Sequence, residues 1–422
     1  MASVRPLYTS DDKLVSEPRL EGEWVSKTLE NASAGETGNH WRVTADKPGC
    51  YTVDTQDNEQ SKEKAREASY QGCLLNLGNK TFFDSTLRTM KVAGKDVAPQ
   101  DMGDGMISVH LIGRVWAQQD FIRMADLNAK WLESNSPEAQ HTNGVFTGPT
   151  QELKNLLGPG PDEAAVGAIW YLCRPGADCD ARVVADALAR DPDDLHVIEG
   201  AGFFFLRHGD YDRSVALFRH CVEKCQPGSD SGFTIDPHVY LGYALLFKRD
   251  FAGARKEFML AHKQDSKDPI EGFLAITYFL EGNYAEAHRL SGVARQAGAQ
   301  DSPQEIILDY ASLVRMGKAK QAEALLAERS AKFIGNDDEH LLLLRATGRI
   351  KDFTPQWKDS DVNEGDTVFY AIARAAQGDT AAARQALEAT LQRGDKALPG
   401  FLGATIEMER LNARPPVNKS KQ

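Results

Sequence analysis

The chain is short of positive charge. Its 422 residues include 49 Lys and Arg against 61 Asp and Glu, which gives a formal net charge of −12. Nucleic acids and anionic membrane surfaces need a basic footprint, so this balance argues against both as partners. Long apolar runs are missing as well, because no stretch approaches the length that crosses a membrane. Residues 1–6 do not have the pattern of a signal peptide.

The sequence also lacks the common catalytic motifs. It contains no glycine-rich phosphate loop before a helix, no Gly-x-Ser-x-Gly and no His-Glu-x-x-His. His196, His208 and His220 recur every 12 residues, but an intervening turn keeps them off a single helix face. Asp84 and Asp104 could form a carboxylate pair, but any β-domain carries such acids at its turns. We therefore predict a non-catalytic protein without a cofactor; the alternative, an enzyme, would need a buried polar cluster with perturbed acids.

Six cysteines fall into three close pairs. Cys173 and Cys179 flank a Pro-Gly turn that brings the chain back on itself, which makes them the best disulfide candidate. Cys50 and Cys73 lie in neighbouring predicted strands and can pair as well. Disulfides would fit an oxidising compartment, although the sequence does not require one.

The third pair, Cys221 and Cys225, is four residues apart on one predicted helix, a separation that aims the two sulfurs poorly for a bond. His220 beside them invites a metal interpretation. Two sulfurs on one helix face do not make a tetrahedral site, so we predict no metal here.

Three stretches of the second half share one pattern. They are 198–221, 238–261 and 271–294. Each reads as helix, tight turn and helix; in the second, Leu241-Gly242 is followed by Ala254 and Phe258, which places small residues where the two helices cross. The pattern resembles the tetratricopeptide repeat (TPR). This resemblance implies a stack of helix pairs that binds proteins rather than catalyses a reaction.

Equivalent turns recur at steps of 30 to 40 residues. The expected turn positions are Gly209, Arg249, Gly282, Gly317, Gly348 and Gly378. Later units depart from the pattern, since Phe353-Thr354-Pro355 breaks the chain where a second helix should begin. The alternative to a repeat array is an irregular helical bundle.

The N-terminal half lacks the helical period. Short apolar runs, several of them alternating, occur at 22–25, 41–44, 49–53, 72–77, 80–84 and 107–112. Short strands at this spacing predict a small antiparallel barrel or curved sheet. Residues 61–68 are expected to be a charged helical excursion or loop, and 126–132 a short helix capped by Asp126.

A second resemblance rests on the order of short motifs in this half. They are Val4-Arg5-Pro6-Leu7-Tyr8-Thr9, Gly22-x-Trp24, Phe82-Phe83-Asp84, the 126–132 helix and Phe146-Thr147-x-x-Thr150-x-Glu152-Leu153. This order resembles a family of uncharacterised bacterial envelope lipoproteins with a lipocalin-like β-domain. The resemblance implies a periplasmic or membrane-anchored protein, although no lipid-carrying cysteine precedes Ser3.

Two Gly-Pro pairs at 158–161 predict a boundary between domains. We expect an α+β multidomain chain: a lipocalin-like β-barrel domain with a short C-terminal helix over 1–157, a linker over 158–161, an all-α TPR-like solenoid over 162–411 and a disordered tail over 412–422. Helices at 162–173 and 180–190 should lead into the repeats.

In TPR arrays the first helix of each unit lines the concave face. The residues expected to face inward are Phe203, Arg207, Tyr240, Tyr243, Phe247, Phe273, Ile276 and Phe279. This aromatic trough with few charges suits an apolar helix or an extended peptide. Alternatively, the rings pack against neighbouring helices or the β-domain.

The sequence thus predicts an interaction scaffold or assembly factor of the bacterial cell envelope, with a protein segment in the groove and membrane contact only through a lipid anchor. The alternative is a carrier of a small apolar ligand in the barrel. An open cavity would favour the carrier, whereas filling by Trp24, Trp41, Phe82 and Phe83 would favour the scaffold.

Overall fold

The chain divides into two compact units, Met1–Asp191 and Pro192–Gln422. The computed structural model describes residues 2–3, 5–57, 65–97, 110–118, 120–137, 141–142, 145–158, 166–224, 236–263, 270–296, 303–330, 344, 347, 364–393 and 396–413. Of the helices within these ranges, none is both long and apolar enough to cross a membrane.

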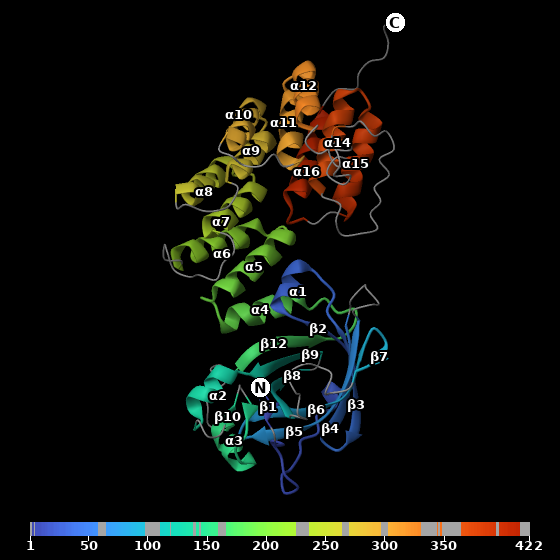
Figure 1. Cartoon of the computed structure of the whole chain (residues 1–422), viewed down its shortest axis with the longest axis vertical. Helices are drawn as coiled ribbons and strands as arrows, with labels where there is room; N and C mark the ends of the chain where they lie inside the picture. Colours follow the sequence, from blue (N-terminus) through green and yellow to red (C-terminus); the bar gives the residue numbers. More distant parts are fainter. Residues whose placement is uncertain are drawn as a thin grey trace. The chain divides into compact units, whose positions relative to one another are not determined.

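Eight antiparallel strands of the first unit close into a β-barrel (Figure 1). In spatial order they are β8 (His110–Ala117), β9 (Phe121–Leu127), β12 (Val166–Cys173), β2 (Gly22–Lys27), β3 (His40–Lys47), β4 (Cys50–Gln56), β5 (Arg66–Leu77) and β6 (Lys80–Val92). The ring closes where β6 pairs with β8 and Phe83 lies opposite Gly113. The predicted fold class, a β-barrel-like domain followed by a TPR-like helical region, is confirmed.

Shorter elements surround the barrel. They are β1 (Ala2–Ser3), β7 (Lys95–Asp96), β10 (His141–Thr142), β11 (Val145–Phe146), the 3-10 helix Pro18–Leu20, α1 (Leu29–Ala34), α2 (Ala129–Asn135), α3 (Thr150–Leu157) and α4 (Asp180–Arg190). Adjacent residues of a strand serve different layers, as the pleat requires. Leu74 and Phe83 join an interior cluster drawn from all eight strands, whereas Leu75 and Phe82 pack with Leu132 of α2 and other residues outside the ring.

Both predicted disulfides are confirmed. Cys50 lies opposite Cys73 on the paired strands β4 and β5, and the two are bonded. Cys173 and Cys179 are bonded across the turn that joins β12 to α4. Cys225 lies outside the described residues, so the pairing of Cys221 stays a prediction.

The prediction of a helix at 162–173 is wrong. Val166–Cys173 form β12, which pairs with β9 on one side and with β2 on the other. The first unit therefore extends to Asp191, beyond the expected end of the β-domain at residue 157. A continuous apolar run has no period that separates a buried strand from a buried helix, and the partners of this strand are distant in sequence.

Two smaller expectations also need correction. Asp126 belongs to β9, and α2 is capped instead by Asn128, whose side chain accepts a hydrogen bond from the Trp131 amide at 3.2 Å. Of the segment 61–68, residues 66–68 begin β5, and 61–64 lie outside the described residues.

The second unit consists of antiparallel helix pairs. The helices are α5 (Leu195–Arg207), α6 (Tyr211–Lys224), α7 (Pro237–Phe247), α8 (Phe251–Lys263), α9 (Ile270–Glu281), α10 (Tyr284–Gln296), α11 (Pro303–Arg315), α12 (Ala319–Ser330), α14 (Glu364–Ala376), α15 (Thr380–Arg393) and α16 (Pro399–Ala413). Five of the six expected turn positions have positive φ: Gly209, Arg249, Gly282, Gly317 and Gly378. Arg249 thus adopts the left-handed conformation without being glycine. The sixth, Gly348, the break at 353–355 and the tail from residue 414 lie outside the described residues.

The small residues of the repeat pattern make room for a ring from the paired helix. A Cβ on Gly202 would lie 2.5 Å from Phe218, and a Cβ on Gly242 would lie 2.5 Å from Phe258. Each glycine is 16 residues before its ring, so the first two repeats use one contact at one spacing. This shared contact fixes the crossing of α5 with α6 and of α7 with α8.

Candidate functional site

The residues expected to line the helical groove differ in burial. Tyr240, Phe247 and Phe279 are buried, which matches the alternative that rings pack against neighbouring helices. The other five are half-buried and remain candidates for partner contact. They are Phe203, Arg207, Tyr243, Phe273 and Ile276.

Two aromatic triads join successive repeats. Phe203 of α5 meets Phe218 of α6 at 5.6 Å between ring centroids and Tyr240 of α7 at 5.3 Å.

One repeat further on, Tyr243 of α7 meets Phe258 of α8 at 6.1 Å and Phe273 of α9 at 5.2 Å. Edge-to-face contacts of this kind stabilise the packing and hold the rings in place. The half-buried members of both triads are therefore rigid where they reach the surface.

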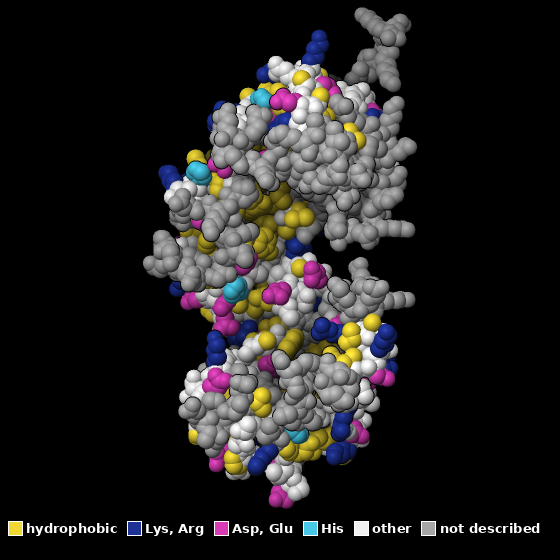
Figure 2. Space-filling model, in the orientation of Figure 1, with side chains coloured by type: hydrophobic (Ala, Val, Ile, Leu, Met, Phe, Trp, Pro, Cys, Tyr) yellow, Lys and Arg dark blue, Asp and Glu magenta, His cyan; other side chains and the backbone are white. Residues whose placement is uncertain are grey.

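The C-terminal helix α16 covers another part of α7 and α9. Leu402 and Ile406 share one apolar cluster with the buried Phe247. Arg410 donates to the Leu280 carbonyl at 2.7 Å. Figure 2 shows hydrophobic side chains gathered over α7, α9 and α16 on the visible face of this unit. Part of the expected groove is thus filled by the chain itself.

One end of the barrel is shut by Trp24 and Arg174. The Trp24 side chain is fully buried, and its indole nitrogen donates to the Leu20 carbonyl at 2.7 Å. The Arg174 guanidinium lies 3.6 Å from the centre of this ring and donates to the carbonyls of Glu21 and Arg19 at 3.0 and 3.1 Å. A cation held over an indole face stabilises this closure.

The other end of the barrel contains a cavity of about 420 Å³. Its lining comprises Asn39, Trp41, Val53, Thr55, Asp57, Tyr70, Phe83, Ser85, Leu111, Ile112, Gly113, Met124, Ala125, Asp126 and Trp170. Eight-stranded barrels are just wide enough to be filled or to hold one small ligand. Here Trp24 and Phe83 fill part of the interior, Phe82 lies in the outer layer, and Trp41 lines the open part.

The cavity has acidic groups but no Lys or Arg among its described lining residues. Burial raises the pKa of Asp126. Burial and the charge of Asp57 raise the pKa of Tyr70. Both shifts mean that negative charge on these two groups is costly in this partly buried site.

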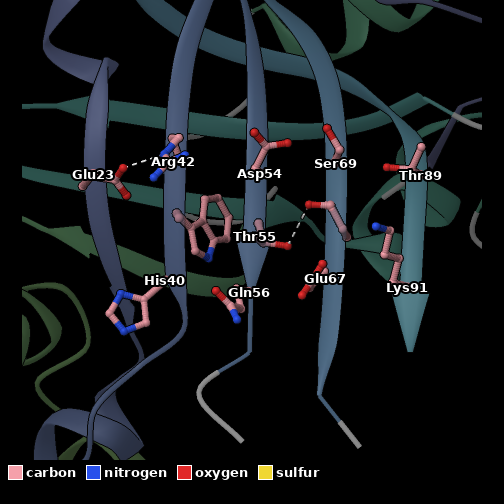
Figure 3. A pocket seen from close by; sticks show the side chains of 12 residues that line it. Glu23, His40, Arg42, Asp54, Thr55, Gln56, Glu67, Ser69, Thr89 and Lys91 are labelled. Carbon is pink, nitrogen blue, oxygen red and sulfur yellow. Dashed lines mark hydrogen bonds and ion pairs between the residues drawn. The ribbon is translucent and has the colours of Figure 1, made fainter. Parts of the chain in front are cut away.

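A second hollow, of about 380 Å³, lies over β2 to β6 (Figure 3). Its mostly exposed polar side chains form two cross-strand rows: Glu23, Arg42, Asp54, Ser69 and Thr89, and His40, Gln56, Glu67 and Lys91. Arg42 donates to Glu23 at 2.5 Å. Mixed charges that pair with one another are typical of a solvated sheet face.

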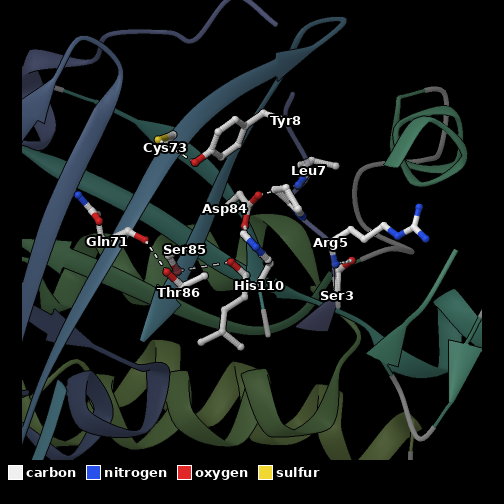
Figure 4. A network of polar contacts seen from close by, with 12 residues as sticks. Ser3, Arg5, Leu7, Tyr8, Gln71, Cys73, Asp84, Ser85, Thr86 and His110 are labelled. Atoms are coloured by element: carbon white, nitrogen blue, oxygen red, sulfur yellow. Dashed lines mark hydrogen bonds and ion pairs between the residues drawn. The ribbon is translucent and has the colours of Figure 1, made fainter. Parts of the chain in front are cut away.

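A buried carboxylate anchors the N-terminal segment to the barrel wall (Figure 4). Asp84 accepts a hydrogen bond from the Leu7 amide at 2.6 Å, and its other oxygen lies 2.8 Å from His110 Nδ1. The Tyr8 hydroxyl lies 3.3 Å from Cys73 Sγ. This network gives the Arg5-Pro6-Leu7-Tyr8 motif a structural role.

The described residues contain no group of three or more His, Cys, Asp or Glu placed around one point. His220 lies 2.8 Å from Asp193, and Cys221 is buried. Sequence analysis did not identify Asp57, Asp126 or Trp170 as residues of a ligand site. Trp170 was assigned to a helix and Asp126 to a cap, so no sequence signal joined them.

No protein-family model matches this chain, and no curated protein matches it. Among solved structures, the chain is similar to one in the crystal structure of the APC/C hetero-tetramer Cut9–Hcn1, at 12% identity and a TM-score of 0.33. The likeness covers 55% of this chain and 39% of that chain. The assignment of a TPR-like array therefore rests on the helix pairs and turns described above.

Proposed function

We propose that this protein is a non-catalytic interaction scaffold that binds a protein segment on the inner helices of its repeat array. The observation that carries the proposal is the row of half-buried apolar side chains Phe203, Tyr243, Phe273 and Ile276 on three successive inner helices. Because neighbouring rings contact the three aromatic members, these side chains lose little entropy on binding. Rigid aromatic side chains of this kind dominate interface energetics.

The partner that suits this row is an apolar helix or extended peptide. Arg207 is the charged member of the half-buried set, so the row offers mainly apolar contact. The buried Tyr240, Phe247 and Phe279 would contribute by fixing the helices rather than by touching the partner.

We further propose that the protein works in a bacterial envelope, in the periplasm or anchored to a membrane through a lipid. Two disulfides support an oxidising compartment. The resemblance of the N-terminal motifs to envelope lipoproteins points the same way. Location in cell fractions, probed with an antibody to this chain, is the direct test.

The binding proposal is tested by affinity capture from a bacterial envelope extract with the intact chain and with a Phe203→Ala, Tyr243→Ala variant. We expect the variant to lose a specific partner by about tenfold or more, because anchor residues each contribute about 1 kcal/mol or more. Circular dichroism establishes that both proteins are folded.

Two matched controls separate binding from folding. Phe258→Leu disturbs the same triad from its buried side and should keep the partner. Met259→Ala, at an exposed position of α8, should also keep it. If the intact chain and the double variant captured the partner equally, the inner helices would not be the binding face.

A second candidate function is binding of a small ligand in the barrel, which the cavity of about 420 Å³ supports. Its size falls within the usual range of ligand pockets. The two functions use different units of the chain and do not exclude each other.

A further inference from the structure

The barrel cavity has an apolar floor and lies at the open end of the barrel. Val53 and Phe83 line it and also belong to the interior cluster that fills the rest of the barrel. Asp57 follows the last residue of β4, and Asp126 is next to the last residue of β9. Neighbouring strands are antiparallel, and β9 and β4 are four steps apart in the order β9-β12-β2-β3-β4. The two strands therefore run in the same direction and end at the same end of the barrel. The carboxylates are therefore placed at the end opposite the Trp24 closure.

Aromatic and thioether side chains form much of the wall between floor and opening. Trp41, Tyr70, Trp170 and Met124 come from four different strands and are all half-buried. Ring faces attract organic cations, with Trp the strongest of them. A polarisable methionine adapts to an alkyl group of variable shape.

The charged side chains among the described lining residues of the cavity are all carboxylates. Asp57 and Asp126 form no ion pair with any side chain in the described part of the chain. No lysine or arginine is among the described lining residues.

We propose that the open end of the barrel binds a small amphiphilic organic cation, with its ammonium group between the carboxylates and rings and its alkyl part on the apolar floor. The inference rests on the second candidate function, ligand binding in the barrel, and names its ligand class. A neutral or anionic amphiphile would leave Asp57 and Asp126 without a counter-charge in a partly dry site.

The experiment compares three probes with the same chain length: octyltrimethylammonium, 1-octanol and octanoate. Each is titrated into the full chain by isothermal calorimetry, below the concentration at which the probe self-associates. We expect octyltrimethylammonium to bind about tenfold or more tightly than octanol, and octanoate to bind weakest.

Variants identify the site. Asp126→Asn should weaken binding of the cation by about tenfold and leave octanol unchanged, and Asp57→Asn should act in the same direction. Asp54→Asn is the matched control, since Asp54 is exposed on the same strand and does not line this cavity. Trp170→Leu should weaken binding of the cation more than binding of octanol. Thermal melts establish that every variant is folded.

The outcomes separate the two levels of the proposal. If all three probes bind with equal affinity, the barrel is a ligand site but not a cation site, and our inference fails alone. If no probe binds, ligand binding in the barrel and our inference fail together. Tight cation binding that Asp126→Asn and Asp57→Asn leave unchanged would also overturn the assignment of the site.

Discussion

The two units of this chain hold their folds in different ways. The barrel depends on pairings between distant residues, such as Val25 with Cys173, and both confirmed disulfides lie within it. The helical array depends on contacts repeated at short range, such as Gly202 with Phe218 and the matching contact one repeat later. Local contacts leave a period in the sequence, whereas long-range pairings do not.

The largest expected effect tests the barrel core. Trp24→Ala should lower the free energy of unfolding of the barrel by about 3–5 kcal/mol, because a fully buried ring is removed. Hydrogen exchange of β2 and β3 peptides, followed by mass spectrometry in urea, measures this unit alone. Trp116→Ala, at a half-buried indole beside Arg123, should cost less than half as much. Equal losses of unfolding free energy in the two variants would mean that packing in the barrel interior is not the main source of its stability.

The disulfides sharpen the comparison within the barrel. Replacing Cys50 and Cys73 with alanine should cost about 3 kcal/mol, and replacing Cys173 and Cys179 about 2 kcal/mol, because the bridges span 23 and 6 residues. Urea unfolding of the two double variants gives the difference. The reverse order would show that chain entropy does not set their contribution.

The array has its own test at the glycine contact. Gly242→Ala should cost about 1–3 kcal/mol, because the new Cβ would overlap the Phe258 ring. Gly272→Ala is the matched control: it lies in α9 with nothing within 4 Å of the new Cβ, and should stabilise by up to about 1 kcal/mol. Thermal melts compare them. If Gly242→Ala left the melting temperature unchanged, the glycine-to-ring contact would not be what sets the packing of the helix pairs.

The smallest effect concerns the contact of α16 with the array. Arg249 donates to both oxygens of Glu409, at 2.9 and 2.8 Å, and these bonds lower the pKa of that carboxyl. A lowered pKa stabilises the fold above the ordinary Glu pKa, and the contribution is lost as the pH falls through the folded value. Because the pair is exposed, Glu409→Gln should cost at most about 1 kcal/mol at pH 7.

The control for that pair is Glu388→Gln, an exposed position of α15. Unfolding at pH 7 and at pH 3 should show a difference between the two variants only at pH 7. A difference that persists at pH 3 would assign the effect to packing rather than to charge.

Much of the array was predictable because its signals are local. Five expected turn positions have positive φ, including Arg249, where a non-glycine residue marks the turn only through its spacing. Four of the six triad rings were predicted to line the trough, but the sequence did not separate the buried Tyr240 from the half-buried Tyr243. Burial depends on which helix packs against each ring, and α16 returns to α7 from more than 150 residues away.

The barrel was predicted as a class but not as a closed structure. Strands β2 to β6 follow the expected apolar runs, whereas β12 was assigned to a helix. Its residues Val166–Cys173 become a strand because β9 and β2 both offer a free edge. Without β12 there is no ring, no cavity and no place for Trp170.

The sequence by itself determined the helix pairs, their turns, most of the strands and two cysteine pairs, because each depends on residues close together in the chain or on the alternation of a single strand. Only the tertiary structure decided the closure of the barrel, the acidic cavity beside Trp41 and Trp170, and the cover that α16 gives to α7. These features join distant segments, and no local pattern encodes which distant partner a segment will meet.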